Sequence, residues 1–219
     1  AAHRHGHHEQ VAVRAIGLMC GDGRGDGETL GQAPDPGRRD ASTARYLFGV
    51  SGGRRSGGES PPAWTLLEKE HLQDCAVFRV GRTWARSPRT GRPAAFYHID
   101  AEDWVNIVPI TADDQVVMVR QYRHGSAGFT LEIPGGMVDP GESPADAAAR
   151  ELLEETGFRA SGVQRLGALN PNPALFGNCC HTYLARDVER VADNANSGHE
   201  ETTVELVPRH EISERACAG

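Results

Sequence analysis

No apolar run in this 219-residue sequence approaches the roughly 18 to 20 residues that a membrane-spanning helix needs. The first ten residues, AAHRHGHHEQ, are polar, so a secretory signal is not expected there. The five cysteines are an odd number and none follows a C-x-x-C spacing, which argues against a disulfide framework and a structural zinc site. We therefore expect a cytoplasmic protein with no membrane partner.

Basic side chains are also scarce: 23 lysines and arginines stand against 30 aspartates and glutamates, for a formal net charge of -7. A surface that coats nucleic acid needs a net basic face, so nucleic acid is not an expected partner. The apolar set AVILMFWYC makes up 38% of the chain, which is low for a sequence that is globular throughout.

Apolar residues are sparsest near the N-terminus. Residues 1–62 hold 13 of the 26 glycines and 4 of the 13 prolines. Such a segment cannot bury enough apolar surface to offset the entropy of ordering it, so we expect a largely disordered tail. Its histidine cluster between His3 and His8 could hold a metal ion, although an incidental tract is the more ordinary explanation. The folded domain is expected to span residues 63–219.

From residue 63 onward, runs rich in β-branched and aromatic residues alternate with turn-forming residues, and such runs predict strands. The runs cover residues 75–80, 94–99, 105–110, 115–122, 162–169, 179–185 and 202–207. Residues 143–156, rich in Ala, Leu and Glu, instead predict a helix, with Ser143 as its N-cap and Gly157 as its C-terminal stop. Many strands around one central helix predict a mixed α/β domain.

Three glutamates of the predicted helix, Glu151, Glu154 and Glu155, stand at i, i+3 and i+4, so their carboxylates share one face. Crowded carboxylates repel one another, and we expect no basic side chain to relieve them, with Arg150 pointing elsewhere. A divalent cation would relieve the repulsion, and hard oxygen donors favour Mg²⁺ or Mn²⁺ over zinc. A solvated acidic face is the alternative.

The segment before the helix, LEIPGGMVDPGE at 131–142, runs from a strand-like start into a glycine-rich loop. Its adjacent glycines, Gly135 and Gly136, allow a backbone carbonyl to approach an ion closely, although such pairs often simply form turns. The loop is expected to fold back over the start of the helix, where Glu142 and Arg150 can form an ion pair.

The stretch from Gly136 to Phe158, GMVDPGESPADAAARELLEETGF, resembles the Nudix box, G-x5-E-x7-R-E-U-x-E-E-x-G-U, in which U is a bulky aliphatic or aromatic residue. Every fixed position agrees; these are Gly136, Glu142, Arg150, Glu151, Leu152, Glu154, Glu155, Gly157 and Phe158. The resemblance covers about residues 63–208 and excludes 1–62. It implies an α/β/α sandwich with a mixed sheet, in which the box forms a loop–helix–loop, and hydrolysis of a nucleoside diphosphate linked to another moiety.

The same resemblance implies roles for individual residues. Glu151 and Glu155 are implied to be catalytic metal ligands, with Glu154 beside them and the carbonyl of Gly135 completing the shell. The box positions implied to be structural are Gly136, Glu142, Arg150 and Gly157. A pyrophosphate is heavily anionic, and Mg²⁺ (or Mn²⁺) ions would neutralise that charge and activate a bound water.

Features outside the box resemble the ADP-ribose and sugar-nucleotide branch of the family. Pro173, within NPNPALFGN at 170–178, stands where a proline marks that branch, although Asn and Pro clusters also form ordinary loops. The resemblance further implies that Arg123, with Glu132 of the following LEIPGG segment, binds the substrate. A guanidinium fork suits two phosphate oxygens, whereas the alternative is a surface arginine.

A glutamate in the loop before the final strand is implied to polarise the attacking water, and either Glu200 or Glu201 falls in that loop. Trp104 could stack on a base, although aromatic residues in strands are usually part of the core. His181 is expected to be a packed histidine, and Cys180 lacks the neighbouring cation that would make it a nucleophile.

Together these features predict a Mg²⁺-dependent hydrolase of the pyrophosphate bond of ADP-ribose or a related nucleoside diphosphate sugar, giving a nucleoside monophosphate and a sugar phosphate. GDP-mannose, dinucleoside polyphosphates and nucleoside triphosphates are alternative substrates, and a non-catalytic sensor of nucleotide sugars is an alternative class. The resemblance also implies a homodimer in which strands of residues 64–100 complete the partner's site. Only residues 209–219 follow the last predicted strand, so the closing helix is expected to be short or clipped.

Overall fold

The computed structural model describes residues 61–195 and 201–218, and those from Pro62 onward belong to one compact unit. The expected disordered tail, with its histidine cluster, lies outside the described residues except for its last two prolines. Glu200 lies outside them as well.

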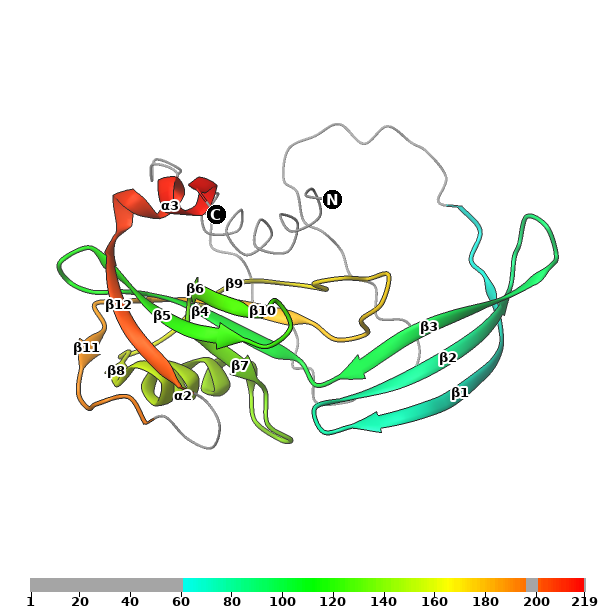
Figure 1. Ribbon diagram of the computed structural model, residues 1–219, viewed down its shortest axis with the longest axis horizontal. Coiled ribbons are helices and arrows are strands. Elements are labelled where there is room, and N and C mark those ends of the chain that lie inside the picture. Colours follow the sequence, from blue (N-terminus) through cyan, green and yellow to red (C-terminus); the bar gives the residue numbers. More distant parts are fainter. Residues whose placement is uncertain (1–60, 196–200, 219) are drawn as a thin grey trace. The chain divides into compact units, whose positions relative to one another are not determined.

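The first three strands form an antiparallel sheet of their own, in the order β1-β2-β3 (Figure 1). They are β1 (Thr65–Cys75), β2 (Phe78–Arg86) and β3 (Pro93–Ala101). The strand predicted at 75–80 is wrong in its middle, because Ala76 and Val77 form the turn between β1 and β2. This sheet leaves large apolar side chains at the surface, among them Leu66, Phe96 and Tyr97.

A seven-stranded mixed sheet forms the centre of the described chain, in the order β12-β5-β4-β10-β9, with β6 paired to β5 and β7 paired to β4. Its strands are β4 (Trp104–Ile110), β5 (Gln115–Arg123), β6 (Gly128–Glu132), β7 (Gly135–Met137), β9 (Gln164–Leu169), β10 (Cys180–Arg186) and β12 (Thr202–Pro208). Strands β4 and β10 run parallel, whereas the other pairs are antiparallel. Two short strands, β8 (Phe158–Arg159) and β11 (Glu189–Arg190), pair separately.

The predicted helix forms as α2 (Pro144–Thr156), and both of its ends match the sequence signals. The Oγ of Ser143 accepts a hydrogen bond from the backbone N–H of Asp146 at 3.2 Å. Gly157 ends the helix in the left-handed region at φ 72°, where its N–H donates to the carbonyl of Leu153. Glycine adopts this conformation at little cost, so the helix stops here.

Helices cover both faces of the central sheet, so the expected α/β/α sandwich is confirmed (Figure 1). On one face, Leu152 of α2 packs against Val105 and Ile107 of β4. On the other, Ile212 of α3 (Ile212–Ala218) packs with Val108 of the same strand. Because neighbouring residues of a strand point to opposite faces, the two helices lie on opposite sides of the sheet.

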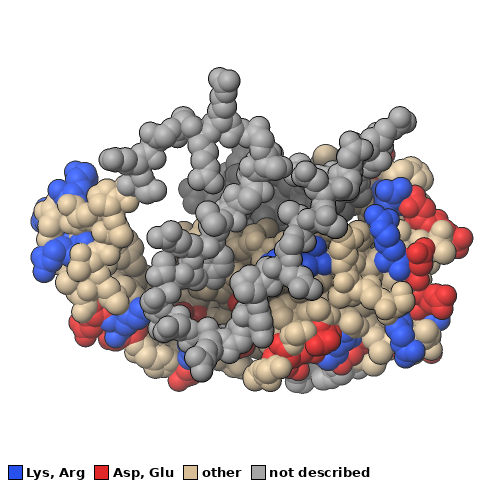
Figure 2. Space-filling model, turned by 180° about the vertical axis from the view of Figure 1, so that it is seen from behind, with Lys and Arg blue, Asp and Glu red and all other residues tan. Residues whose placement is uncertain are grey.

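The chain closes with a short 3₁₀ turn, η1 (Arg209–Glu211), and α3, which spans seven residues. Within this segment, Glu211 and Arg215 form an i, i+4 ion pair at 3.1 Å. On the face drawn in Figure 2, acidic and basic side chains of the described residues lie next to each other. Within residues 61–195 and 201–218, no helix has the length and apolar character needed to cross a bilayer.

Candidate functional site

Strand β7 and helix α2 bring the glycine pair against the glutamates of the helix. Strand β7 pairs with β4, with Gly135 opposite Asn106 and Gly136 opposite Val105. The N–H of Gly135 donates to Oε2 of Glu155 at 2.9 Å. A Cβ atom at Gly136 would lie 2.5 Å from Cδ of Glu151, closer than real side chains approach. The glycines therefore let the backbone of β7 come directly up to the carboxylates of α2.

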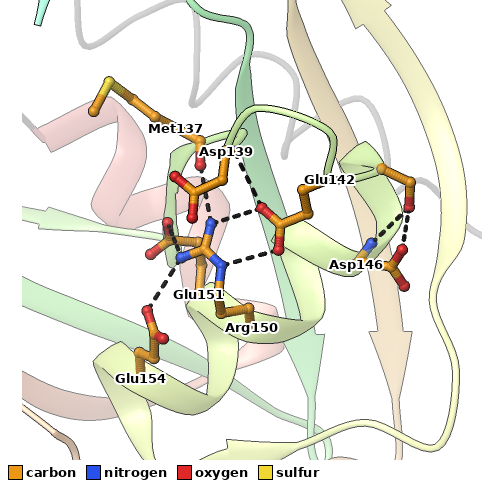
Figure 3. Close-up of polar contacts among 8 residues, drawn as sticks. Met137, Asp139, Glu142, Asp146, Arg150, Glu151 and Glu154 are labelled. Atoms are coloured by element: carbon orange, nitrogen blue, oxygen red, sulfur yellow. Dashed lines mark hydrogen bonds and ion pairs between the residues drawn. The ribbon is translucent and has the colours of Figure 1, made fainter.

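Arg150, in the middle of α2, is the centre of the polar contacts between this helix and the loop before it (Figure 3). Its Nε and Nη2 donate to the two carboxylate oxygens of Glu142, both at 3.0 Å, and Nη2 also donates to the carbonyl of Met137. Its Nη1 donates to Glu151 at 2.9 Å and to Glu154 at 3.1 Å. The expected ion pair between Glu142 and Arg150 is therefore confirmed.

The expectation that Arg150 points away from the glutamates is wrong. Glu154 is one helical turn further on, at i+4, and the long arginine side chain also reaches Glu151 beside it. The hydrogen bonds to Glu142 raise the pKa of the Arg150 guanidinium, and the charge of Glu151 and the hydrogen bonds to Glu151 and Glu154 act in the same direction. The same contact lowers the pKa of Glu142. Arg150 thus relieves part of the repulsion among the carboxylates, for which a divalent cation was the expected partner.

The loop between β7 and α2 is held by short-range contacts that fix its shape. The backbone N–H of Asp139 donates to Oε2 of Glu142 at 3.2 Å, and the hydroxyl of Ser143 donates to Asp146 at 2.6 Å (Figure 3). With Glu142 also bound to Arg150, the loop is tied to the helix at several points. The predicted fold-back of the loop over the helix start is confirmed.

The glutamates differ in exposure. Glu151 and Glu155 are buried, at 9% and 7% exposure, whereas Glu154 is exposed. As the side chains stand, no three His, Cys, Asp or Glu residues among those described are grouped to hold a metal ion, and the Arg150 guanidinium lies between Glu142, Glu151 and Glu154. The donor set nevertheless fits a hard divalent cation, because it consists of carboxylate oxygens beside a glycine cradle that a Cβ atom would fill.

A second polar pair lies on the same face of the sheet as α2. Arg123 donates two hydrogen bonds to the carboxylate of Glu132, from Nε at 3.0 Å and from Nη2 at 2.7 Å. The hydroxyl of Thr130 donates to the same carboxylate. Burial alone would raise the pKa of Glu132, but these hydrogen bonds outweigh it and lower that pKa. Arg123 lies on the face of β5 that carries Val117, which packs against α2.

The remaining predicted site residues lie in loops. Pro173 is exposed in the segment between β9 and β10, which is folded on itself by a hydrogen bond from the side chain of Asn170 to the carbonyl of Phe176. Glu201 is exposed immediately before β12. The next residue, Thr202, donates from its hydroxyl to the carbonyl of Glu155 at 3.1 Å. Glu201 is thereby placed beside the end of the box helix.

Sequence reasoning missed Asp103, Thr202 and Asn194, which hold loops in place. The Asn194 amide donates to the carbonyl of Thr202, so both residues brace the C-terminal end of α2. The one signal for them is residue type, since Asn, Asp and Thr outside helices commonly bond to nearby backbone. Asp103 contacts the ring of His181 at 3.2 Å, and His181 is largely buried, as expected for a packed histidine.

Two further side chains, Cys180 and Trp104, lie in surroundings that account for them without a catalytic role. Burial raises the pKa of the Cys180 thiol to about 11, which is the wrong direction for a nucleophile. Trp104 is half-buried and packs edge-to-face on Phe176, with ring centres 5.8 Å apart.

Comparisons with known proteins find related sequences. A family model described as NUDIX domain matches residues 103–218. The ADP compounds hydrolase NudE of Escherichia coli is 39% identical over 109 residues, covering 50% of this chain and 53% of that protein. An ADP-ribose pyrophosphatase of Mycobacterium tuberculosis is 33% identical over 158 residues, covering 70% of this chain and 74% of its own.

The similarity extends to a solved structure. A crystal structure of an ADP compounds hydrolase superposes with a TM-score of 0.62 at 26% identity, covering 72% of this chain and 86% of that one. Coverage of the relatives varies, and the chain spans about half the length of the Escherichia coli protein.

Proposed function

This chain belongs to the Nudix family, and from that premise we propose that it hydrolyses the pyrophosphate bond of ADP-ribose or a related nucleoside diphosphate sugar. The products are a nucleoside monophosphate and a sugar phosphate. One observation carries the proposal: Glu151 and Glu155 are buried on one face of α2, directly against the glycine pair of β7. The names of the bacterial relatives, an ADP compounds hydrolase and an ADP-ribose pyrophosphatase, support this substrate class.

Glu151, Glu154 and Glu155, with the carbonyl of Gly135, are the groups that would hold Mg²⁺ or Mn²⁺. The cation supplies neutralisation of the diphosphate charge and a bound water of lowered pKa. The chain itself supplies the orientation: Gly136 admits the carboxylate of Glu151, and Arg150 fixes the loop against the helix. Positioning of this kind accounts for much of the rate in phosphoryl chemistry.

Residues outside the box would position the substrate and the water. The guanidinium of Arg123 suits diphosphate oxygens, and Glu132 keeps it oriented by binding Nε and Nη2. The loop of Pro173 would contact the nucleotide sugar. Glu201, braced beside the end of α2 through Thr202, is our candidate to take the proton of the attacking water, with Glu200 as the alternative.

We further propose that residues 63–219 form the hydrolase domain, that residues 1–62 are a separate tail, and that the active form is a homodimer. Exposed apolar side chains on β1–β3 support the dimer, because they offer a second copy a surface to bury. The thiols of the four described cysteines are free, in keeping with a reducing cytoplasm.

The proposal is tested by incubating the protein and Mg²⁺ with ADP-ribose, GDP-mannose, UDP-glucose and diadenosine polyphosphates, and by counting released phosphomonoesters after phosphatase coupling. We expect ADP-ribose to be the best substrate. Preference for GDP-mannose would contradict the proposed substrate, and tight binding without turnover would favour a sensor.

A matched pair of variants tests the site in the same assay. Glu155→Gln should reduce the rate on the order of 10³-fold or more while the fold survives. Glu205→Gln is the control. It removes a carboxylate that pairs with the exposed side chains of Arg120 and Arg215, and it should leave the rate unchanged. Equal rates for the two variants would refute the metal-ligand assignment.

A further inference from the structure

Asp103 stands immediately before β4, the strand that pairs with β7 of the box on one side and with β10 on the other. Its backbone carbonyl accepts a hydrogen bond from the N–H of Val138 at 2.9 Å, which extends the β4–β7 pairing into the box loop. The side chain of Asp103 instead contacts residues at the start of β10. Oδ1 accepts from the N–H of Cys179 at 2.9 Å, and Oδ2 lies 3.2 Å from Nε2 of His181.

Neighbouring contacts fix the loop at 170–178 to the same short segment of chain. The side-chain amide of Asn178, itself buried, donates to the carbonyl of Glu102 at 2.8 Å. Further along the loop, the carbonyl of Leu175 accepts from the N–H of Ile99 at 2.7 Å. The loop that carries Pro173 therefore rests on residues just before β4, and it enters β10 at the point where Asp103 holds Cys179.

The carboxylate is the strongest of these anchors. Hydrogen bonds from a backbone N–H to an ionised acceptor are roughly twice as strong as those between neutral groups. The backbone of Cys179 is held on both sides, since its carbonyl also accepts from the N–H of Trp104 at 2.8 Å. Removing the Asp103 side chain would leave the buried Cys179 N–H without this acceptor while leaving the bond between Asp103 O and Val138 intact.

We propose that Asp103 is a positioning residue that holds the 170–178 loop in register with the catalytic box. It acts through the backbone of Cys179 and the ring of His181, and the same residue is joined to the box through Val138. The loop is then ordered before the substrate arrives, so that binding does not have to order it. The inference rests on the proposed function, because contact between this loop and the substrate is part of that proposal.

The test compares three variants of the full chain. Asp103→Ala removes both side-chain contacts. Asp103→Asn keeps an oxygen for the Cys179 N–H, and its amide nitrogen can donate to Nε2 of His181. The control is Asp114→Asn. Asp114 lies in the β4–β5 turn, and its carboxylate also joins distant segments, because it pairs with Arg209 at 2.6 Å. Asp114 has φ 59°, which asparagine tolerates.

Two readouts are expected to move together in Asp103→Ala. Amide hydrogen exchange of residues 170–181, measured without substrate, should accelerate about tenfold, while α2 keeps its protection. KM for ADP-ribose should rise about tenfold, equivalent to about 1.4 kcal/mol, with kcat within about twofold of the parent. Asp103→Asn should recover most of both effects, and Asp114→Asn should show neither.

Unchanged exchange of residues 170–181 in Asp103→Ala would overturn the proposal, as would a fall in kcat at constant KM. Should that variant fail to fold, Asp103→Ser takes its place with the same expectations, since a hydroxyl is too short to reach both partners. Failure of the proposed function would look different: the parent protein would turn over none of the tested nucleotides, while the exchange measurement would still decide the role of Asp103.

Discussion

Gly136 of β7 and Glu151 of α2 are packed so closely that no Cβ atom fits between them: one built at Gly136 would lie 2.5 Å from Cδ of Glu151. The three nearest atoms all belong to the far end of the Glu151 side chain, which is flexible. We therefore expect a side chain at this position to move the Glu151 carboxylate and to leave the fold in place. Gly136 is required by the site more than by the sheet.

We expect Gly136→Ala to fold with a thermal midpoint close to that of the parent and to lose about 10²-fold in kcat, because a displaced Glu151 no longer has its productive geometry. Gly162→Ala is the matched control, since a Cβ atom there meets nothing within 4 Å. Thermal unfolding and steady-state kinetics on both variants check the prediction. A fully active Gly136→Ala would show that the position of Glu151 does not matter for turnover.

Arg150 supplies the next prediction, because its guanidinium holds Glu142, Glu151 and Glu154 together. Arg150→Gln should lower the free energy of unfolding by about 1.5 to 3 kcal/mol, the range found for hydrogen bonds to charged groups. Mg²⁺ should then stabilise this variant more than the parent, since repelling carboxylates gain more from a bound cation.

Differential scanning calorimetry with EDTA and with Mg²⁺ measures both effects of Arg150→Gln. Arg215→Gln is the control: it breaks ion pairs to Glu205 and Glu211 at the surface, and should cost much less stability than Arg150→Gln, because surface ion pairs contribute little. Equal stabilisation of all three proteins by Mg²⁺ would argue that Arg150 and the cation do not act on the same carboxylates.

The box helix was predictable because its signals are local. Ser143 caps the first turn and Gly157 stops the last, so the chain needs no distant contact to define the ends of α2. The β1–β2 turn was not predictable in this way, because Ala76 and Val77 are not turn-forming residue types and only pairing with the neighbouring strands places them. Local residue choice decides the first case, and sheet register decides the second.

The candidate site shows the same division. The face shared by Glu151 and Glu155 follows from helical spacing, and the structure adds that both are buried. The direction of Arg150 depended on the length and flexibility of its side chain and on the position of Glu142, which the loop alone decides. Asp103 contacts residues far along the chain, so periodicity carried no signal for it.

Gly157 allows a test of the way α2 is held at its C-terminal end. It has φ 72°, and a Cβ atom there would clash with the backbone of Ala192, 2.8 Å from its carbonyl carbon. In Gly157→Ala, the strain of the left-handed backbone alone should lower the free energy of unfolding by about 1 to 2 kcal/mol, and the clash should lower it further. Gly91 has φ 69° and open space around it, so Gly91→Ala should show only the loss of stability that comes from backbone strain. Urea unfolding measures the difference, and equal losses would mean that the 191–195 segment yields freely.

The pH dependence of stability tests the contact between Glu142 and Arg150. The hydrogen bond from Arg150 lowers the pKa of Glu142 below its ordinary value of 4.5, so the folded state binds the proton less readily than the unfolded chain. The ionised carboxylate therefore stabilises the fold above that ordinary value, and the contribution is lost as the pH falls through the lowered folded pKa. Acid should weaken the parent protein more than a variant without this carboxylate.

We accordingly expect Glu142→Gln to have a lower thermal midpoint than the parent at neutral pH, and the difference to narrow as the pH is lowered to about 3. Calorimetry between these limits at constant ionic strength follows the convergence. Glu189→Gln, at an exposed position on β11, should track the parent throughout. A constant gap between Glu142→Gln and the parent would mean that the contact with Arg150 does not depend on the charge of Glu142, since protonation of that carboxylate is the one change the comparison isolates.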